Sequence, residues 1–474
     1  MPLQPPDFQT VHAPLAWWAR HSPSAMALDD GDVQLSFAEL AARVATDAAA
    51  LDAEDAPAVV WAHETASPVD QLQRFLAIIA SGRTAAVSDP DWPARVRDEV
   101  RVRMASLARA RPGAEPVAAG SPFYIGFTSG STGVPKGFQR THGSWTRSFD
   151  ICVQSFGPAT QTTLLVPGRL SHSLFLFGAL LGLWTGAGMR VQPRFSAASA
   201  LETLRLGQAG SLVAVPSQLL LMLEHAQRHR MDPITATQLV MISGAPWPRA
   251  RTTALRALFP SARIVEFYGA SETSFIAWVD SDRSVPDDVV GRPFSNVELR
   301  VEAPAPGLIY VRSPMVFSNY VTLTAEEDST AVLRDGDWLS VRDMGHIDEE
   351  GFLHLVGRQQ RMLLVQGKNL FPEEVENVLA GHPSVAAASV QGLPHDVRGT
   401  QAVALLVLSD ATDRSALVAW CQERLEPFKL PRRFYAVDAW PRTPSGKTDH
   451  AALARLLAAH LASPNAPAAG LRLL

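Results

Sequence analysis

The chain has 474 residues, a length that predicts two or three domains rather than a single core. Hydrophobic residues make up 47% of it, which excludes a disordered protein, and a net charge of −5 without a long basic run gives no reason to expect a nucleic-acid partner. The two cysteines, Cys152 and Cys421, lie far apart in sequence, so neither a disulfide framework nor a cysteine metal site is expected.

The N-terminal sequence and the apolar runs predict a soluble, cytoplasmic protein. The first residues, with Pro2, Pro5 and Asp7, lack the basic and apolar regions of a signal peptide. The longest uncharged apolar run, residues 174–184, has about half the length that a membrane span requires. No membrane span is therefore expected.

Helices and strands are predicted to alternate before residue 120. Residues 14–29 and 36–52 have helical patterns, and Ser36 with Glu39 forms a capping box at the start of the second helix. Apolar stretches near 57–61 and 84–88 read as strands on either side of a helix around 69–81. This alternation predicts β-α-β units and a parallel sheet.

Residues 123–137 combine a short apolar strand with a loop rich in glycine and hydroxyl side chains. Hydroxyl groups, glycines and one lysine follow the strand in the order Thr128, Ser129, Gly130, Ser131, Thr132, Gly133, Lys136 and Gly137. Glycines let the backbone approach a ligand closely, and the hydroxyl, N–H and ammonium groups suit a polyphosphate. A flexible serine–glycine linker is the alternative, but a linker does not need a hydrophobic strand before it.

The loop does not have the usual P-loop spacing, because Lys136 follows Pro135, and no G-x-G-x-x-G lies near a strand. It resembles the phosphate loop of the adenylate-forming superfamily, which contains acyl- and aryl-CoA synthetases, luciferases and nonribosomal-peptide adenylation domains. The resemblance implies that residues 128–133 and Lys136 bind the phosphates of ATP.

The apolar segment 170–184 predicts a buried helix with His172 at its start. The resemblance implies that His172 lines the acyl pocket near the reacting carboxyl; a histidine satisfied by a backbone group is the alternative. Amino-acid-activating relatives usually carry an aspartate here, and 170–184 contains no acid, which favours a substrate without an α-amino group. The pocket candidates are His172, Phe175, Trp184, Ser243, Ala245, Trp247, Gly269 and Ile276.

Residues 239–242 and 262–265 read as strands, each followed by residues that suit a nucleotide. The first leads to Ser243-Gly244-Ala245, where a flat ring could lie against the backbone. The second leads to Glu266-Phe-Tyr-Gly-Ala-Ser-Glu-Thr273, which is similar to the family's Tyr-Gly-x-Thr-Glu. The resemblance implies that Tyr268 stacks on adenine, Ser271 donates to the α-phosphate and Glu272 binds magnesium, a cation that prefers oxygen ligands. It also assigns Gly244, Ala245, Glu266 and Phe267 to the nucleotide site.

The C-terminal third continues in the family's order. Residues 307–320 resemble a β-rich subdomain, Asp343 corresponds to the acid that binds the ribose hydroxyls, and Arg358 matches a ribose or phosphate contact. A turn residue is the alternative for Asp343, because Gly345 is near. The hinge departs from the pattern: Gln360 takes the hinge position, and Arg361 stands where relatives often have an acid.

Residues 385–435 read as strand, strand, helix, strand, and Pro441-Arg-Thr-Pro-Ser-Gly-Lys447 looks like the family's terminal catalytic motif. Attack of a carboxylate on the α-phosphate brings two anions together, so positive charge stabilises the transition state. The resemblance implies that Lys447 supplies that charge.

These motifs predict an α/β fold with two domains. Residues 1–358 form a large N-terminal domain of parallel-sheet αβαβα subdomains plus a β-rich subdomain, and residues 359–474 form a small mobile α+β domain with a hinge near Gln360. The implied reaction is ATP- and magnesium-dependent formation of acyl-AMP and pyrophosphate, followed by transfer to the thiol of CoA or of a carrier protein's phosphopantetheine. The expected substrate is an aryl or medium-chain carboxylic acid.

Three alternatives stay open. Lys429, Arg432 and Arg433 could meet a carrier protein or a CoA phosphate, or form an ordinary solvated basic patch. The chain could be a stand-alone amino-acid-activating domain. It could also be a nucleotide-binding sensor without turnover, an idea that the altered hinge supports and that Lys136, Glu272 and Lys447 oppose.

Overall fold

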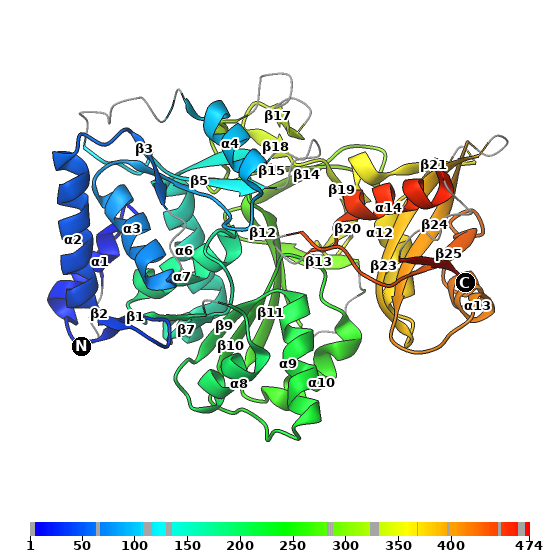
Figure 1. Ribbon diagram of the computed structural model, residues 1–474, viewed down its shortest axis with the longest axis horizontal. Coiled ribbons are helices and arrows are strands. Elements are labelled where there is room, and N and C mark those ends of the chain that lie inside the picture. The colour runs from blue at the N-terminus through cyan, green and yellow to red at the C-terminus, as the bar shows by residue number, and fades with distance from the viewer. Residues whose placement is uncertain are drawn as a thin grey trace.

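The polypeptide folds into a large N-terminal part and a smaller C-terminal part that lie side by side along the longest axis (Figure 1). The structure is a computed structural model, and it describes residues 5–62, 67–105, 107, 116–128, 135–192, 194–281, 284, 286, 288–322, 331–366, 368–395, 399–443, 447–462 and 470–474. The predicted fold class is confirmed.

A five-stranded sheet in the large part carries the phosphate loop. Its strands, in spatial order, are β16 (Asn319–Tyr320), β6 (Lys136–Thr141), β5 (Pro122–Thr128), β4 (Thr84–Val87) and β3 (Val59–Ala62). Strands β3, β4 and β5 are parallel, as predicted, whereas β5 and β6 are antiparallel. The last pair of that register joins Thr128 to Lys136, so both ends of the loop leave the same end of the sheet.

A second sheet of fifteen strands spans the rest of the large part. Its strands, in spatial order, are β17 (Leu333–Asp335), β18 (Trp338–Ser340), β15 (Gly307–Arg312), β19 (Asp343–Ile347), β20 (Leu353–Arg358), β13 (Val289–Pro293), β12 (Ser274–Asp280), β11 (Arg263–Ala270), β10 (Leu239–Ile242), β9 (Ser211–Ala214), β7 (Leu164–Val166), β8 (Met189–Val191), β1 (Met26–Asp29) and β2 (Gln34–Ser36), with β14 (Glu298–Val301) beside β15. Pairing is parallel from β1 through β11 and antiparallel from β11 to β17. The antiparallel half is the predicted β-rich subdomain.

The helices of the large part cover these two sheets. They are α1 (Ala13–His21), α2 (Phe37–Ala53), α3 (Pro68–Ala80), α4 (Ala94–Arg103), α6 (His142–Phe156), α7 (Ser173–Thr185), α8 (Ala197–Arg205), α9 (Pro216–Arg228) and α10 (Thr252–Leu258), with 3-10 turns η1 (Gly157–Gln161) and η2 (Arg249–Arg251). A further 3-10 turn, η3 (Gln359–Arg361), follows β20 and leads to the C-terminal part. The capping box of Ser36 and Glu39 at α2 is confirmed, and α7 is buried on nearly all sides, as its apolar sequence predicts.

One predicted helix is wrong in its second half. Residues 14–29 were expected to be helical, but α1 ends at His21 and residues 26–29 form β1. Pro23 follows the end of α1, and a residue before proline favours an extended backbone over a helical one. Leu28 and Asp29 then pair with β8, and Ala27 and Leu28 are fully buried in the core.

The small C-terminal part has its own sheet and its own core. The sheet order is β22 (Lys368–Leu370), β21 (Leu363–Val365), β24 (Gly399–Leu408), β25 (Arg433–Val437) and β26 (Leu471–Leu473), with β23 (Val385–His395) on β24 and helices α12 (Pro372–Ala380), α13 (Arg414–Gln422) and α14 (His450–Ala462). The predicted order of strand, strand, helix, strand over 385–435 is confirmed. Along β24, Ala404 and Leu406 belong to one apolar cluster and Val403 and Leu405 to another, so both faces of this sheet are packed.

The sequence analysis expected no membrane span, and the helices of the structure bear on that expectation. None of the helices in the described ranges is long and apolar enough to cross a membrane.

Candidate active site

Three residues that matched separate motifs meet in one cluster. Asp343 of β19 lies opposite Arg358 of β20 in the strand register, and the Arg358 Nε donates to Asp343 Oδ1 at 3.1 Å. The hydroxyl of Tyr268 donates to the other oxygen, Asp343 Oδ2. Burial, followed by the negative charge of Asp343, raises the pKa of Tyr268 well above its usual value, so this phenol stays a neutral donor.

A bulge in the strand next to Tyr268 sets its position. The register of β11 and β12 shifts between Tyr268 and Gly269. A Cβ on Gly269 would lie 1.9 Å from the carbonyl oxygen of Ser274, so only glycine fits this close approach of two backbones. The bulge alone therefore explains why the predicted pocket residue at position 269 is a glycine.

Lys447 reaches this cluster from the C-terminal part. Although the residue is exposed, surrounding protein replaces part of the water at its ammonium group, and this loss of hydration lowers the pKa of Lys447 from 10.5, with Arg358 acting in the same direction. The charges of Glu272 and Asp343 act on the same ammonium in the opposite direction. A hairpin closes the Lys447 loop, where Thr443 N donates to Lys447 O at 2.7 Å.

Glu272 is held on both its backbone and its side chain. Only 8% of the residue is exposed. The Tyr320 hydroxyl donates to Glu272 Oε1 at 2.5 Å, and Phe317 N donates to the Glu272 carbonyl at 2.7 Å. The ammonium of Lys136 lies 5.9 Å from the centre of the Tyr320 ring, so Tyr320 links the phosphate-loop lysine to Glu272.

The single carboxylate of Glu272 suits a magnesium ion that arrives with a nucleotide. No group of three or more His, Cys, Asp or Glu side chains arranged to hold a metal occurs in the part of the chain that the structure describes. Magnesium is usually bound through one or two carboxylates together with substrate phosphates, and only rarely by an all-protein cage. The donor set at Glu272 fits that mode.

The phosphate loop itself is described only at its two ends. Ser129, Gly130, Ser131, Thr132 and Gly133 lie outside the described residues. Thr128 and Lys136 flank that segment, and the N–H of Gly137 donates to Thr322 Oγ1 at 2.7 Å, which anchors the strand directly after Lys136.

The other nucleotide candidates differ in what their side chains do. Gly244 has φ +92, a conformation that favours glycine, and both Gly244 and Ala245 are exposed at the end of β10.

The side chains of Glu266 and Phe267 are engaged within the protein. The Glu266 carboxylate accepts a hydrogen bond from Ser281 Oγ at 2.7 Å. The Phe267 ring packs in the core against Phe275, with centroids 4.8 Å apart. Only the backbone of Glu266 and Phe267 is therefore left for a ligand. Ser271, which precedes Glu272, is partly exposed.

His172 lies at the start of α7 with Phe175 beside it, their ring centroids 6.3 Å apart. The His172 Nε2 is 3.9 Å from Asp89 Oδ2, and Arg169 Nη1 lies 3.2 Å from Asp89 Oδ1. Asp89 is only 8% exposed. The sequence analysis did not single out Asp89, which comes from a turn 83 residues before His172.

Two of the pocket candidates do not join His172. Trp184 stands 12 residues further along α7, roughly 18 Å away at 1.5 Å per residue, and packs on Phe8 and Phe149 at 5.4 and 5.1 Å. Trp247 belongs to the apolar cluster under α8, α9 and α10, and its indole donates to Thr252 Oγ1. Ile276 is buried on β12 in the main core, and the Ser243 hydroxyl donates to the Phe267 carbonyl at 2.8 Å.

Arg140 is a second residue that the sequence analysis missed. It is 1% exposed and lies on β6, two residues after the buried Phe138 and on the same face. An arginine at a core-facing position of a strand is the signal that could have identified it, because buried charges are usually paired or fully hydrogen-bonded.

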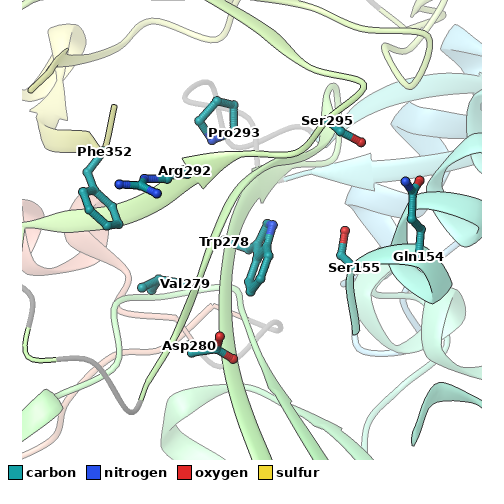
Figure 2. A pocket seen from close by; sticks show the side chains of 9 residues that line it. All are labelled: Gln154, Ser155, Trp278, Val279, Asp280, Arg292, Pro293, Ser295 and Phe352. Atoms are coloured by element: carbon teal, nitrogen blue, oxygen red, sulfur yellow. The ribbon is translucent and has the colours of Figure 1, made fainter. Parts of the chain in front are cut away.

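A separate hollow of about 520 Å³ lies between the C-terminal end of α6 and strands β12 and β13 (Figure 2). Arg292 stacks over Phe352 at 4.4 Å on one side of it, and Asp280 pairs with Arg263 at 2.7 Å. None of the motif residues described above lines this hollow, so it is distinct from the candidate active site.

Two protein-family models match the chain, one in each part. The AMP-binding enzyme family matches residues 55–321, and the AMP-binding enzyme C-terminal domain matches residues 374–447. The chain is 38% identical over 335 residues to an uncharacterized acyl--CoA ligase, YhfT, of Bacillus subtilis, which covers 69% of this chain and 67% of that protein. It is 30% identical over 331 residues to 2-succinylbenzoate--CoA ligase of Bacillus subtilis, which covers 68% and 66%.

Solved structures share the fold over nearly the whole length. The o-succinylbenzoate CoA synthetase from Bacillus subtilis, solved with its acyl-adenylate intermediate, has a TM-score of 0.80 at 24% identity and covers 94% of this chain and 98% of that one. The amide bond synthetase McbA from Marinactinospora thermotolerans has a TM-score of 0.79 at 25% identity and covers 94% and 99%.

Proposed function

The chain belongs to the AMP-binding enzyme family, and we propose that it is an acid–thiol ligase that first converts a carboxylic acid and ATP to acyl-AMP and pyrophosphate. The observation that carries this proposal is the position of Lys447. Its ammonium is influenced by the charges of Glu272, Asp343 and Arg358, although the four residues come from four motifs and from both parts of the chain.

This arrangement suits adenylation because the reaction develops negative charge on phosphate and leaving-group oxygens. Lys447 supplies positive charge there, and Lys136 with Thr128 faces the phosphates from the other side. Asp343 accepts from the ribose hydroxyls, and Tyr268 presents its ring to adenine. Glu272 would hold a magnesium ion that arrives with the nucleotide, and the ion would offset the negative charge of the phosphates.

The proposed acid is aryl or medium-chain and lacks an α-amino group. Support comes from α7, whose residues 173–185 contain no acid to pair with a substrate amine, and from His172 and Phe175 at its start. One relative is named for 2-succinylbenzoate, an aryl acid.

The proposed acceptor is CoA, and the phosphopantetheine of a carrier protein is the alternative. Two relatives are named as CoA ligases, which supports the first choice. Lys429, a candidate contact for a carrier protein, already pairs with Glu374 at 2.7 Å and Glu426 at 3.0 Å, whereas Arg432 and Arg433 are exposed.

We further propose that the two domains meet at residues 358 and 359, with Gln360 as the hinge. Strand β20 ends at Arg358 in the large sheet, and β21 begins at Leu363 in the small one, so only four residues connect them. Rotation of the small domain would then replace Lys447 in the site with other residues for the thiol step.

A pyrophosphate-release assay tests the proposal. Aryl, short, medium and long-chain acids and the amino acids are each supplied with ATP and magnesium, with CoA or with hydroxylamine to trap the adenylate. Acid-dependent release that rises with CoA is expected. Release only with hydroxylamine would point to a carrier protein, and dependence on an amino acid would replace the proposed substrate class. Silence with every acid, while ATP still binds, would overturn the ligase in favour of a sensor.

A further inference from the structure

The guanidinium of Arg140 has no part in the chemistry above, yet it is fully enclosed and each of its nitrogens is engaged. Its Nε donates to Ser144 Oγ at 3.1 Å and its Nη1 to the Ser271 carbonyl at 2.7 Å. Its Nη2 donates to Ser274 Oγ at 2.6 Å and to the Met315 carbonyl at 2.5 Å. A single side chain thus joins three segments that are distant in sequence.

Two of these segments hold Glu272. Ser271 is the residue immediately before it. Met315 begins the stretch in which Phe317 N donates to the Glu272 carbonyl and the Tyr320 hydroxyl donates to the Glu272 carboxylate. Arg140 therefore holds the backbone immediately before Glu272 and the segment from which Tyr320 binds the Glu272 carboxylate.

The buried positive charge of Arg140 also interacts with the Glu272 carboxylate. The oxygens that it contacts belong to neutral carbonyl and hydroxyl groups, which do not cancel a buried positive charge. Burial lowers the pKa of Arg140 to about 9, and the charge of Glu272 acts in the opposite direction, ahead of Tyr124. The guanidinium is therefore charged at neutral pH. Among the acidic groups around it, Glu272 contributes most to stabilising that charge.

We propose that Arg140 is a positioning residue that fixes the orientation of the Glu272 carboxylate and thereby sets the affinity of the site for magnesium-bound nucleotide. This inference rests on the proposed function, in which Glu272 is the magnesium ligand.

The test compares ATP binding with magnesium and with EDTA, by calorimetry, in the full-length protein. In Arg140→Lys and Arg140→Met we expect the tightening of ATP binding by magnesium to fall by about 10-fold, the usual effect of losing a residue that orients a metal ligand. Binding without metal should stay within about 2-fold of the unchanged protein, because the phosphate loop and Asp343 are intact. Arg147→Met, on the exposed face of α6, the helix that carries the Arg140 partner Ser144, is the matched control.

A milder variant guards against unfolding. Ser144→Ala removes the partner of Arg140 Nε, together with the hydrogen bond from that hydroxyl to the Thr141 carbonyl, at a helix position that alanine favours. It should lower the magnesium effect by a smaller factor in the same direction. Unchanged magnesium dependence in Arg140→Lys and Ser144→Ala would overturn the proposal. An equal loss of binding with and without metal would also overturn it, since Arg140 would then support only the fold.

Glu272→Gln separates this inference from the proposed function. We expect that change to abolish most of the magnesium effect, and Arg140→Lys to add nothing in its presence. If Glu272→Gln leaves the magnesium effect intact while Arg140→Lys reduces it, the assignment of Glu272 fails and the inference fails with it. If Glu272→Gln removes the effect and Arg140→Lys does not, only the role of Arg140 is rejected.

Discussion

At the scale of single residues, Lys447 is distinguished by the charges around it. A surface lysine is surrounded by water, whereas this ammonium has Arg358, Glu272 and Asp343 within electrostatic reach and has lost part of its hydration. Both the lost hydration and Arg358 favour the neutral amine. A neutral amine would not stabilise the negative charge of the proposed adenylation step, so we expect activity to depend on the protonation state of this one group.

The first prediction concerns the pH dependence of adenylation. Because the pKa of Lys447 is lowered from 10.5, the rate of acyl-AMP formation should fall as pH rises through a value below 10.5. Lys447→Arg should be slower at every pH but should lose this alkaline limb, because a guanidinium stays protonated to pH values above about 12. The measurement is the pH profile of trapped adenylate for both proteins.

Lys447→Ala is the companion variant, and it should slow acyl-AMP formation by about 10²- to 10³-fold with little change in nucleotide affinity. Lys429→Ala removes a lysine of the same part that pairs with Glu374 and serves as the control. An unchanged adenylation rate in Lys447→Ala, or the same alkaline limb in Lys447→Arg, would contradict the role of this lysine.

The second prediction concerns Asp89. Its carboxylate lies 3.9 Å from His172 Nε2 and accepts from Ser171 Oγ at 3.4 Å, so it orients the side chain at the start of α7. Asp89→Asn should raise KM for the acid by roughly 10-fold, which corresponds to ~1.4 kcal/mol, with KM for ATP unchanged. Asp91→Asn is the matched control, because Asp91 pairs with Arg169. An equal rise in both variants would show that Arg169, and not His172, transmits the effect.

The site residues predicted from sequence differ in one physical respect from those that only the structure indicates. Lys447, Glu272, Asp343 and Arg358 stand in short motifs whose neighbours resemble those of a known family. Arg140 and Asp89 have partners 131 to 175 and 80 to 83 residues away, respectively, and stand outside the motifs that carried the assignment. The position of Arg140 at a core-facing site of a strand could have been recognised from the sequence. Only the fold shows which oxygens its guanidinium contacts.

At the scale of elements, η3 is held from both sides. Gln359 Oε1 accepts from Arg342 Nη1 of the large part at 2.8 Å. Arg361 binds Glu373 at 2.9 Å and Glu376 at 2.6 Å on α12 of the small part. Gln360 lies between these two attachments, which is consistent with a pivot confined to that residue. Arg361, unusual for this position, thus makes the connection to the small part stiff.

The third prediction follows from these ion pairs. Arg361→Gln leaves Glu373 and Glu376 side by side without a cation, and burial already raises the pKa of Glu373. We expect the midpoint of thermal unfolding of the small part to fall by roughly 5 °C, the shift that ~1 kcal/mol produces in a domain of this size. A raised native pKa means that stability is lost as pH rises through it, so the deficit should be larger at pH 8 than at pH 5.

Calorimetric unfolding at the two pH values measures this deficit, with Arg424→Gln as the control because Arg424 and Glu423 form an exposed pair. In the same variant the thiol step should slow more than adenylation, since in the proposed reaction cycle only the thiol step requires rotation of α12 with the hinge. A pH-independent deficit would contradict the electrostatic explanation.

Local sequence patterns identified most elements but not their ends. The capping box located the start of α2, and the apolar run located α7. The misread segment was 22–29, where helical periodicity competes with pairing to β8, a partner strand about 160 residues later in the chain. Such long-range pairing leaves no local signal.

At the scale of the whole molecule, the two parts have separate cores and share one site. The apolar clusters of the large part contain no residue beyond 355 among those described, and those of the small part begin at 363. Lys447 is therefore the contribution of one folding unit to a site whose other residues, Glu272, Asp343 and Arg358, belong to the other.

The fourth prediction tests this division. A fragment of residues 1–358 should fold and bind ATP within about 10-fold of the full chain, a loss of ~1.4 kcal/mol, because Tyr268, Asp343 and Lys136 are all retained. It should form no detectable acyl-AMP, because Lys447 is absent. Calorimetry and the hydroxylamine trap measure the two properties. A fragment that adenylates would remove Lys447 from the chemistry, and one that does not fold would move the boundary.

The sequence predicted the parallel strands and a β-rich region, but not that these two regions join into one sheet of fifteen strands. The sheet is continuous because β12 pairs with β13 and β13 pairs with β20. These pairings join segments that are distant in sequence, and no local sequence pattern predicts them.

That continuous sheet has a consequence for the growing polypeptide on the ribosome. Strand β1 can pair at once with its neighbour β2, but its other edge waits for β8, about 160 residues later, which takes roughly 10–30 s at ordinary rates of synthesis. During that time the apolar side chains of Ala27 and Leu28 and a row of unpaired backbone groups are accessible to other chains. Strand β1 is therefore a segment that we expect a chaperone to protect during synthesis.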